Sequence, residues 1–404
     1  KNCQFTENNH MDIRGISSTD IFIATGQDSQ LEGLANNALS HGIDLYMRQD
    51  FKGAVKEFQR SIGLAPNASN SVDAASYMAD AYLALDDTKG AIKAYKTALR
   101  LNPYRDNINI KLGNLYFSEE RYTEATAEYE KAVKLNPSGE NIFALGQAYM
   151  NTGRYSDADT QFNKVLRMAP REPNGNFGLG LNYSKQGRYE DAITQFKAAI
   201  RLDDKFYDAY AEMGYAFADL GQIDEAMDLV NFLEDPAPEL ADTLSSYVYE
   251  VDPPKILFAH ATSSFNYWMP IKSPVSSLDT YLQTADASKT FTMKFQFDKE
   301  MERSEVENVM NWHIGRSSGI GPGTAYNFGL PVPQTEVQPP PIPVNVYYDA
   351  KEMTATVYFK IQQKATADGT IDPSHIEFRF NGKDAFGLKM HPDFDQFSGF
   401  SKVY

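Results

Sequence analysis

The sequence predicts a multi-domain α + β chain, in which a solenoid of paired helices is followed by a β-sandwich. Two observations carry this prediction. Alanines recur at spacings of 37, 34, 33, 34 and 34 residues, at Ala54, Ala91, Ala125, Ala158, Ala192 and Ala226. From Lys255 onward, helical periodicity gives way to an alternation of apolar and polar residues, which is typical of strands.

Each of these alanines belongs to a fixed pattern of small and aromatic residues. In the copy from Asp106 to Gly139, the pattern consists of Gly113, Tyr116, Ala125, Tyr129, Ala132 and Pro137. Small residues let two helices pack closely, aromatic residues fill the space between units, and proline ends a helix. Unrelated amphipathic helices do not explain a fixed period, so we expect one helix–turn–helix unit to be stacked repeatedly.

This period and pattern resemble the tetratricopeptide repeat (TPR). The resemblance implies a right-handed α-solenoid of about six TPRs over residues 31–250, in which residues 239–249 form a capping helix. It also implies a function in binding other proteins. The carboxylate clamp of chaperone-binding TPR proteins is absent, because its positions hold Leu39, Ile43, Ser76 and Ile110.

Residues 1–30 are expected to form an N-terminal arm. The β-prone run 19–25 includes Ile21, Phe22 and Ile23 and has no hairpin partner nearby. Two interpretations stay open for it. The run would lie on the first repeat as an ordered arm, or it would be a strand donor to a sheet edge elsewhere, for example in another subunit.

Residues 251–404 are expected to form the second domain. Alternating strand candidates occupy residues 255–260, 290–297, 344–348, 354–361 and 375–380. The stretches 295–301, 304–306, 311–314, 346–349 and 383–387 resemble the bacterial Ig-like module of surface-layer and adhesin proteins. That resemblance covers about residues 255–390 and implies an Ig-like β-sandwich. The Gly- and Pro-rich insertion 315–343 departs from the family pattern, and residues 265–286 have no assigned place in it.

The first helix of each repeat is expected to line the inner groove of the solenoid. Counted from the recurring alanines, the groove positions carry many amide and aromatic side chains. Amides both donate and accept hydrogen bonds, so this mixture suits an extended peptide better than a charged ligand. The predicted peptide-binding residues are Asn36, Tyr46, Asn107, Asn114, Phe117, Phe143, Gln147, Asn151, Asn174 and Phe177.

Composition narrows the function classes. The net charge of -16 argues against a nucleic-acid partner and against adsorption to anionic membranes. No apolar run is long enough to predict insertion into a membrane. The one cysteine, Cys3, and the six histidines show no metal-ligand spacing, and no nucleophile or metalloprotease motif occurs. We therefore expect no catalytic residues, no metal and no cofactor.

The sequence thus predicts a non-enzymatic scaffold that holds a segment of an unidentified protein in the TPR groove. The Ig-like resemblance places this scaffold in a bacterial cell-surface or extracytoplasmic assembly, with a cytoplasmic location left open. The alternative is a self-assembling structural subunit, a homo-polymer that builds a filament or surface layer. The lone run 19–25 and the sheet edges of the second domain motivate this alternative.

Overall fold

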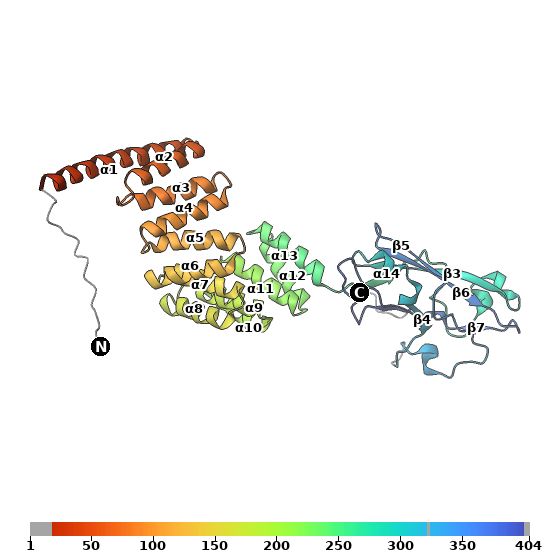
Figure 1. The fold of residues 1–404 in the computed structure, drawn as a ribbon. Helices are drawn as coiled ribbons and strands as arrows, with labels where there is room; N and C mark the ends of the chain where they lie inside the picture. The colour runs from red at the N-terminus through yellow and green to blue at the C-terminus, as the bar shows by residue number, and fades with distance from the viewer. Residues whose placement is uncertain (1–17, 321–323, 400–404) are drawn as a thin grey trace, which may run out of the picture. The chain divides into compact units, whose positions relative to one another are not determined.

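The computed structural model describes the backbone of residues 18–320 and 324–399 and the side chains of residues 28–320 and 324–399 (Figure 1). The chain divides into two compact units. The first comprises Lys1–Leu220 with Asp228–Asp242, and the second comprises Gly221–Met227 with Thr243–Tyr404. The first unit is helical and the second is rich in strands.

Helices stack in chain order through the first unit, as Figure 1 shows. Over residues 18–251 they form consecutive pairs followed by one further helix: α1 (Ser18–Met47) and α2 (Phe51–Leu64), α3 (Ser71–Leu83) and α4 (Thr88–Leu101), α5 (Asp106–Ser118) and α6 (Tyr122–Leu135), α7 (Gly139–Asn151) and α8 (Tyr155–Met168), α9 (Asn174–Lys185) and α10 (Tyr189–Leu202), α11 (Tyr207–Asp219) and α12 (Ile223–Leu233), and α13 (Pro238–Val251). The predicted helical solenoid is therefore confirmed.

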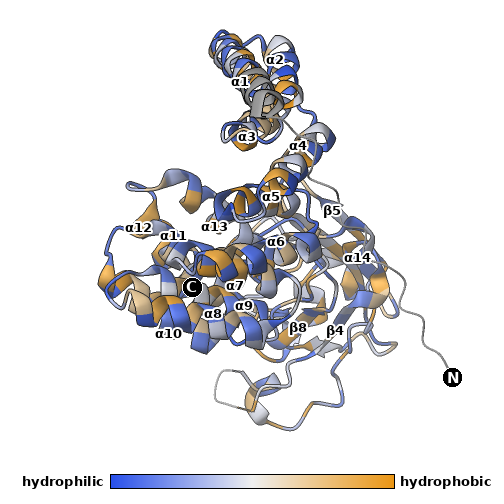
Figure 2. Cartoon of the chain, turned by 60° about the vertical axis from the view of Figure 1, so that its left-hand side comes forward, coloured by the Kyte–Doolittle hydropathy of each residue, from blue (hydrophilic) through white to orange (hydrophobic). Residues whose placement is uncertain are grey.

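The two helices of a pair meet where a small residue faces an aromatic ring. All six recurring alanines are fully buried. A Cβ atom added to Gly113, Gly146 or Gly180 would lie 2.6, 2.7 or 2.4 Å from a ring carbon of Tyr129, Phe162 or Phe196, respectively. Glycine is required at these crossings because any side chain would displace the ring. Figure 2 shows apolar and polar residues interspersed along these helices.

The prediction of a strand in the N-terminal arm is wrong. Residues Ile21, Phe22 and Ile23 lie within helix α1, which begins at Ser18. Extending an existing helix adds one hydrogen bond per residue without a new nucleation cost, and α1 contains no proline to stop it. This extension outweighs the modest helix penalty of β-branched isoleucine.

Two antiparallel sheets enclose the core of the second unit. The first has the order β1-β3-β6-β5 and the second the order β4-β8-β9. Their strands are β1 (Ile256–Ala259), β3 (Ser288–Phe297), β6 (Thr354–Gln362), β5 (Asn345–Asp349), β4 (Trp312–Arg316), β8 (Ile376–Phe380) and β9 (Gln396–Phe397). The five predicted strands are confirmed, whereas β4 and β9 were not among the strand candidates. Phe295 of the first sheet contacts Trp312, Phe378 and Phe397 of the second, with ring centroids 5.4–5.6 Å apart.

The stretch 265–286, which the sequence left unplaced, packs against this core. It carries β2 (Ser273–Pro274) and the 3-10 turns η1 (Val275–Ser277) and η2 (Thr280–Gln283). Phe265, Val275 and Leu282 on this stretch are buried. Strand β2 pairs with β7 (Thr370–Ile371).

The described part of the insertion 315–343 covers a sheet edge. The N–H of Ile314 on β4 donates to the carbonyl of Pro341 at 2.9 Å. Residues 338–343 read Gln-Pro-Pro-Pro-Ile-Pro, so only Gln338 and Ile342 in this segment have a backbone N–H. The segment therefore satisfies the edge strand while offering few donors to a further strand.

A buried lysine joins the end of α13 to the strands within the second unit. Lys299 is 2% exposed, and its ammonium lies 3.0 Å from Oδ2 of Asp384. The same ammonium donates to the carbonyl oxygens of Tyr249 and Asp252 at 2.5 and 2.6 Å. Carbonyls at a helix C-terminus lack intrahelical donors and attract a cation, so Lys299 satisfies both the helix end and a buried carboxylate.

Replacing Lys299 by methionine should destabilise the protein by about 3–5 kcal/mol, because Asp384 then remains as a buried charge without its partner. Thermal or chemical unfolding followed by circular dichroism measures this loss. Lys351→Met, in the exposed turn between β5 and β6, is the matched control and should leave stability unchanged. Equal stability of the two variants would contradict the assigned role of Lys299.

Gly180→Ala should cost about 1–3 kcal/mol, because the new methyl group overpacks the crossing with Phe196. Gly63→Ala on α2 is the control, since nothing lies within 4 Å of the added methyl group. That control should gain about 0.5–1 kcal/mol from helix propensity. Urea unfolding of both variants tests the difference in sign, and a stabilising Gly180→Ala would refute the packing argument.

Candidate peptide-binding groove

The ten predicted groove residues all lie on first helices of the repeats. Asn36 and Tyr46 are on α1, and the others follow on α5, α7 and α9: Asn107, Asn114, Phe117, Phe143, Gln147, Asn151, Asn174 and Phe177. Each side chain is exposed or half-buried, whereas the glycines and alanines at the crossings are buried. The first helices therefore pack through one face and present the predicted residues on another.

Ion pairs link neighbouring first helices near the N-terminal end of the predicted groove. Lys111 on α5 lies 2.9 Å from Oδ2 of Asp80 on α3, and Arg105 lies 2.8 Å from Oδ1 of Asp73. The hydroxyl of Tyr95 donates to Oδ1 of Asp80 at 2.5 Å. Burial and this hydrogen bond raise the pKa of Tyr95, so the hydroxyl stays protonated as a donor. The charges in this part of the groove are thus largely compensated.

The central groove carries oriented amide groups. The hydroxyl of Tyr129 donates to Oδ1 of Asn114 at 2.7 Å, and this contact directs the amide nitrogen of Asn114 away from Tyr129. Burial raises the pKa of Tyr129 to about 12, which keeps that hydroxyl a donor. The amide nitrogen of Asn151 donates to the backbone carbonyl of Gln147 at 2.9 Å, which fixes the orientation of this amide.

Half-buried aromatic rings accompany these amides. Phe117 packs edge-on against Tyr122 at 5.1 Å, and Phe143 packs against Phe162 at 5.4 Å. Phe177 contacts Phe196 at 5.9 Å. Each ring is held by a neighbouring ring, so it can receive an apolar side chain without losing much conformational freedom.

Acidic residues gather at the last repeat, a feature that the sequence reasoning missed. Residues 203–252 contain 14 acidic residues and a single basic one, Lys205, whereas residues 51–202 contain 17 acidic and 20 basic residues. Burial raises the pKa of Glu212 on α11, while Lys185 lowers it and Asp208 raises it further. A count of charges in windows along the sequence would have found this asymmetry.

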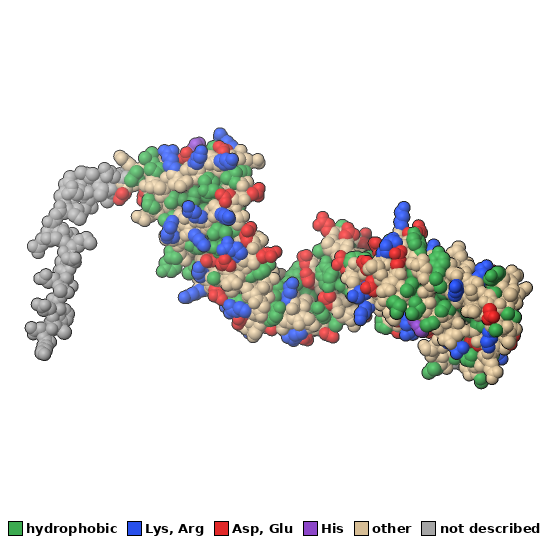
Figure 3. Space-filling view, turned by 45° about the vertical axis from the view of Figure 1, so that its right-hand side comes forward, with side chains coloured by type: hydrophobic (Ala, Val, Ile, Leu, Met, Phe, Trp, Pro, Cys, Tyr) green, Lys and Arg blue, Asp and Glu red, His purple; other side chains and the backbone are tan. Residues whose placement is uncertain are grey.

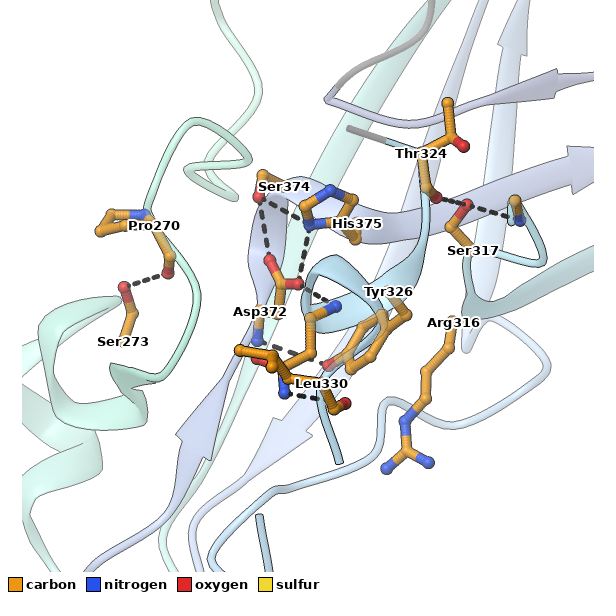
Figure 4. Close-up of polar contacts among 12 residues, drawn as sticks. Pro270, Ser273, Arg316, Ser317, Thr324, Tyr326, Leu330, Asp372, Ser374 and His375 are labelled. Carbon is orange, nitrogen blue, oxygen red and sulfur yellow. Dashed lines mark hydrogen bonds and ion pairs between the residues drawn. The ribbon is translucent and has the colours of Figure 1, made fainter. Parts of the chain in front are cut away.

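The second unit contains an Asp–Ser–His cluster that does not have the geometry of a hydrolase triad (Figure 4). Nδ1 of His375 lies 2.7 Å from Asp372 and 3.3 Å from the hydroxyl of Ser374. A triad needs the acid and the nucleophile on opposite ring nitrogens, whereas here both face the same one. The N–H of Asn327 also donates to Asp372 at 2.8 Å, so the cluster fastens the insertion to the turn before β8.

Two further properties concern the part of the chain that the structure describes. No helix there is both long and apolar enough to cross a bilayer. No group of three or more His, Cys, Asp or Glu side chains in the same residues has an arrangement that could hold a metal ion.

Comparisons with known proteins identify the repeats. Residues 79–118, 113–153 and 180–221 match the family described as TPR repeat, and residues 140–172 match tetratricopeptide repeat. A curated relative, small glutamine-rich tetratricopeptide repeat-containing protein 2 of Mycosarcoma maydis, is 31% identical over 115 residues, which are 28% of this chain. The chain spans only 29% of the length of that relative.

Solved structures that resemble part of this chain include two that are described as TPR proteins. A tetratricopeptide repeat protein from Parabacteroides merdae ATCC 43184 is 15% identical, with a TM-score of 0.49 over 54% of this chain and 86% of that one. MamA is 24% identical, with a TM-score of 0.36 over 45% and 97%. YrrB, described as a TPR protein with an unusual peptide-binding site, is 20% identical, with a TM-score of 0.36 over 47% and 97%.

The family matches show that the helical solenoid contains TPR repeats. TPR proteins generally mediate protein–protein interactions, so the class of function predicted from the sequence is supported.

The raised pKa of Glu212 predicts a pH-dependent effect of Glu212→Gln. The folded state favours the protonated carboxyl, so this group opposes folding increasingly as the pH rises above the ordinary value of 4.5. The amide mimics the protonated form and should therefore raise stability at neutral pH but not at about pH 3.5. Urea unfolding at both pH values measures the change in stability, and Glu190→Gln at an exposed position of α10 is the control. An effect of Glu212→Gln that does not depend on pH would contradict the prediction.

Proposed function

We propose that this protein is a non-enzymatic scaffold that binds an extended segment of a partner protein in the groove formed by its first helices. The observation that carries the proposal is that α1, α5, α7 and α9 each have two faces of different composition. Their small residues are buried at helix crossings, while amide and aromatic side chains remain accessible on another face. A purely structural solenoid does not require amides at these repeated accessible positions.

Amides and rings at these positions recognise different parts of an extended segment. An amide such as Asn114 or Asn151 can pair with backbone N–H and C=O groups, which every sequence offers. Half-buried rings such as Phe143 and Phe177 receive apolar side chains and so select among sequences. The ligand class is accordingly an unfolded or linear segment, and the ion pairs near α3 and α5 leave little net charge for a free anion.

We also propose that the second unit is an Ig-like module. If its strands are lettered in chain order with β2 and β7 set aside, the two sheets are A-B-E-D and C-F-G, the order of constant-type immunoglobulin domains. Trp312, on the strand lettered C, is buried in the core, as is usual for that fold. This module supports a bacterial cell-surface or extracytoplasmic location, which protease accessibility in intact cells would test.

The self-assembling subunit receives less support. The edge of β4 is covered by the Pro-rich segment. On edge strand β5, the backbone N–H of Tyr348 donates to the side chain of Glu307 at 3.1 Å, and the backbone carbonyl of Tyr348 accepts from the side chain of Arg303 at 2.8 Å. Edges blocked in this way disfavour strand addition from another molecule. A mass that grows with concentration in light scattering, rather than staying near 45.3 kDa, would revive this alternative.

Peptides selected from a random display library on the full chain should lose about tenfold in affinity for the double variant Asn107→Ala/Asn174→Ala, since two lost hydrogen bonds contribute about 1–3 kcal/mol together. Asn231→Ala, an exposed amide on second helix α12, is the matched control and should bind as the wild type does. Fluorescence anisotropy gives both affinities. Failure to enrich any peptide whose binding depends on Asn107 and Asn174 would defeat the proposed function.

A further inference from the structure

We propose that the segment held in the groove has two chemically different ends: an apolar end that packs against α1 and α3, and a lysine- or arginine-rich end that meets α11. This inference rests on the proposed function and specifies the partner chemistry of the same groove. It follows from three zones of different character, all within the first unit.

The zone at α1 and α3 is apolar and accessible. Met47 and Ile43 on α1 and Leu83 on α3 are 77, 36 and 37% exposed. Tyr46 lies beside them with its ring edge-on to Phe51 at 5.2 Å. Apolar side chains left in water at a groove position favour contact with apolar groups of a ligand. Figure 3 shows hydrophobic side chains gathered over these N-terminal helices.

The middle zone, at α3 and α5, carries little net charge. The Asp80–Lys111 and Asp73–Arg105 ion pairs cancel their own charges at distances of 2.9 and 2.8 Å. Beyond them, α5 presents Asn107, Asn114 and Phe117 without a further charge at the groove positions. This zone can hold a neutral stretch of peptide but offers no preference for either sign of charge.

The zone at α11 is acidic. Phe206, which precedes α11, lies 4.7 Å from groove residue Phe177, so the segment 203–208 borders the groove. Asp203, Asp204 and Asp208 on this segment are exposed and are accompanied by one cation, Lys205. Lys185 and Glu212 form a neighbouring pair of opposite charges. The local balance is therefore negative.

These zones fix both composition and direction of the ligand. A basic end is attracted to α11 and gains nothing at the compensated zone near α3, while an apolar end buries its side chains against the exposed apolar residues of α1 and α3. A segment with the opposite charge is repelled at α11, which gives discrimination as well as affinity. Because the acidic side chains are exposed, salt should weaken the preference.

The test uses the full chain and two fluorescein-labelled probe peptides. Both have leucine and phenylalanine in one half; the other half is rich in lysine in one probe and in glutamate in the other. The lysine probe should bind at least about tenfold more tightly at low salt, and the difference should shrink at high salt. Equal affinity of the probes, tighter binding of the glutamate probe, or no binding of either would overturn the inference.

Charge-reversal variants locate the basic end. Asp204→Lys/Asp208→Lys should weaken binding of the lysine probe about tenfold and leave thermal unfolding nearly unchanged. The matched control, Glu190→Lys/Asp228→Lys, makes the same change in net charge on exposed positions of second helices and should alter affinity less than about twofold. Equal losses for both double variants would mean that only net charge matters, which contradicts a localised basic end.

A photocrosslinker tests direction. Placed at the apolar end of the lysine probe, it should label peptides from α1 or α3; placed at the basic end, it should label α11. The reverse pattern would overturn the inference while leaving groove binding intact. Failure of the proposed function itself has a different signature, namely the absence of any library peptide that depends on Asn107 and Asn174.

Discussion

The close approach of two helices at a small residue is the contact on which the first unit depends. Gly113, Gly146 and Gly180 each face an aromatic ring at a distance that excludes even a methyl group. A ring pressed against bare backbone fixes the separation of the helices, and repetition of that separation sets the step from one pair to the next. The same geometry presents one face of each successive first helix, and the proposed peptide-binding residues lie on that face.

Much of this architecture was predictable because residues of the same type recur at regular spacings in the sequence. The spacing of Ala54 and its equivalents predicted the helix pairs, and alternation around Phe291 predicted β3. Features that depend on a single distant contact were not predictable. Lys299 reads as one more surface lysine in sequence, yet it is buried against Tyr249 and Asp384. Nothing local in the sequence distinguishes it.

Short segments were the other source of difference. The run around Ile21–Ile23 favours strand by residue type, but it is continuous with a helix that needs no new nucleus. At the candidate site, positions within the repeat identified accessible side chains such as Asn114, whereas their neighbours were not foreseeable. The hydrogen bond from Tyr129 and the stacks of Arg154 and Arg188 on Tyr149 and Tyr183, at 4.1 and 4.2 Å, arise from side-chain geometry.

The proline-rich segment beside β4 has a consequence for behaviour in concentrated solution. A β-sheet grows when an incoming strand finds regularly spaced N–H donors at its margin, and a run of Pro339, Pro340 and Pro341 supplies none. Ile314 nevertheless keeps its own hydrogen bond through Pro341. The segment therefore acts as a terminal cover that completes the sheet chemically and ends it. Resistance of this edge to strand addition therefore comes from the missing backbone donors of the prolines, whereas protection by surface charge would vary with pH and ionic strength.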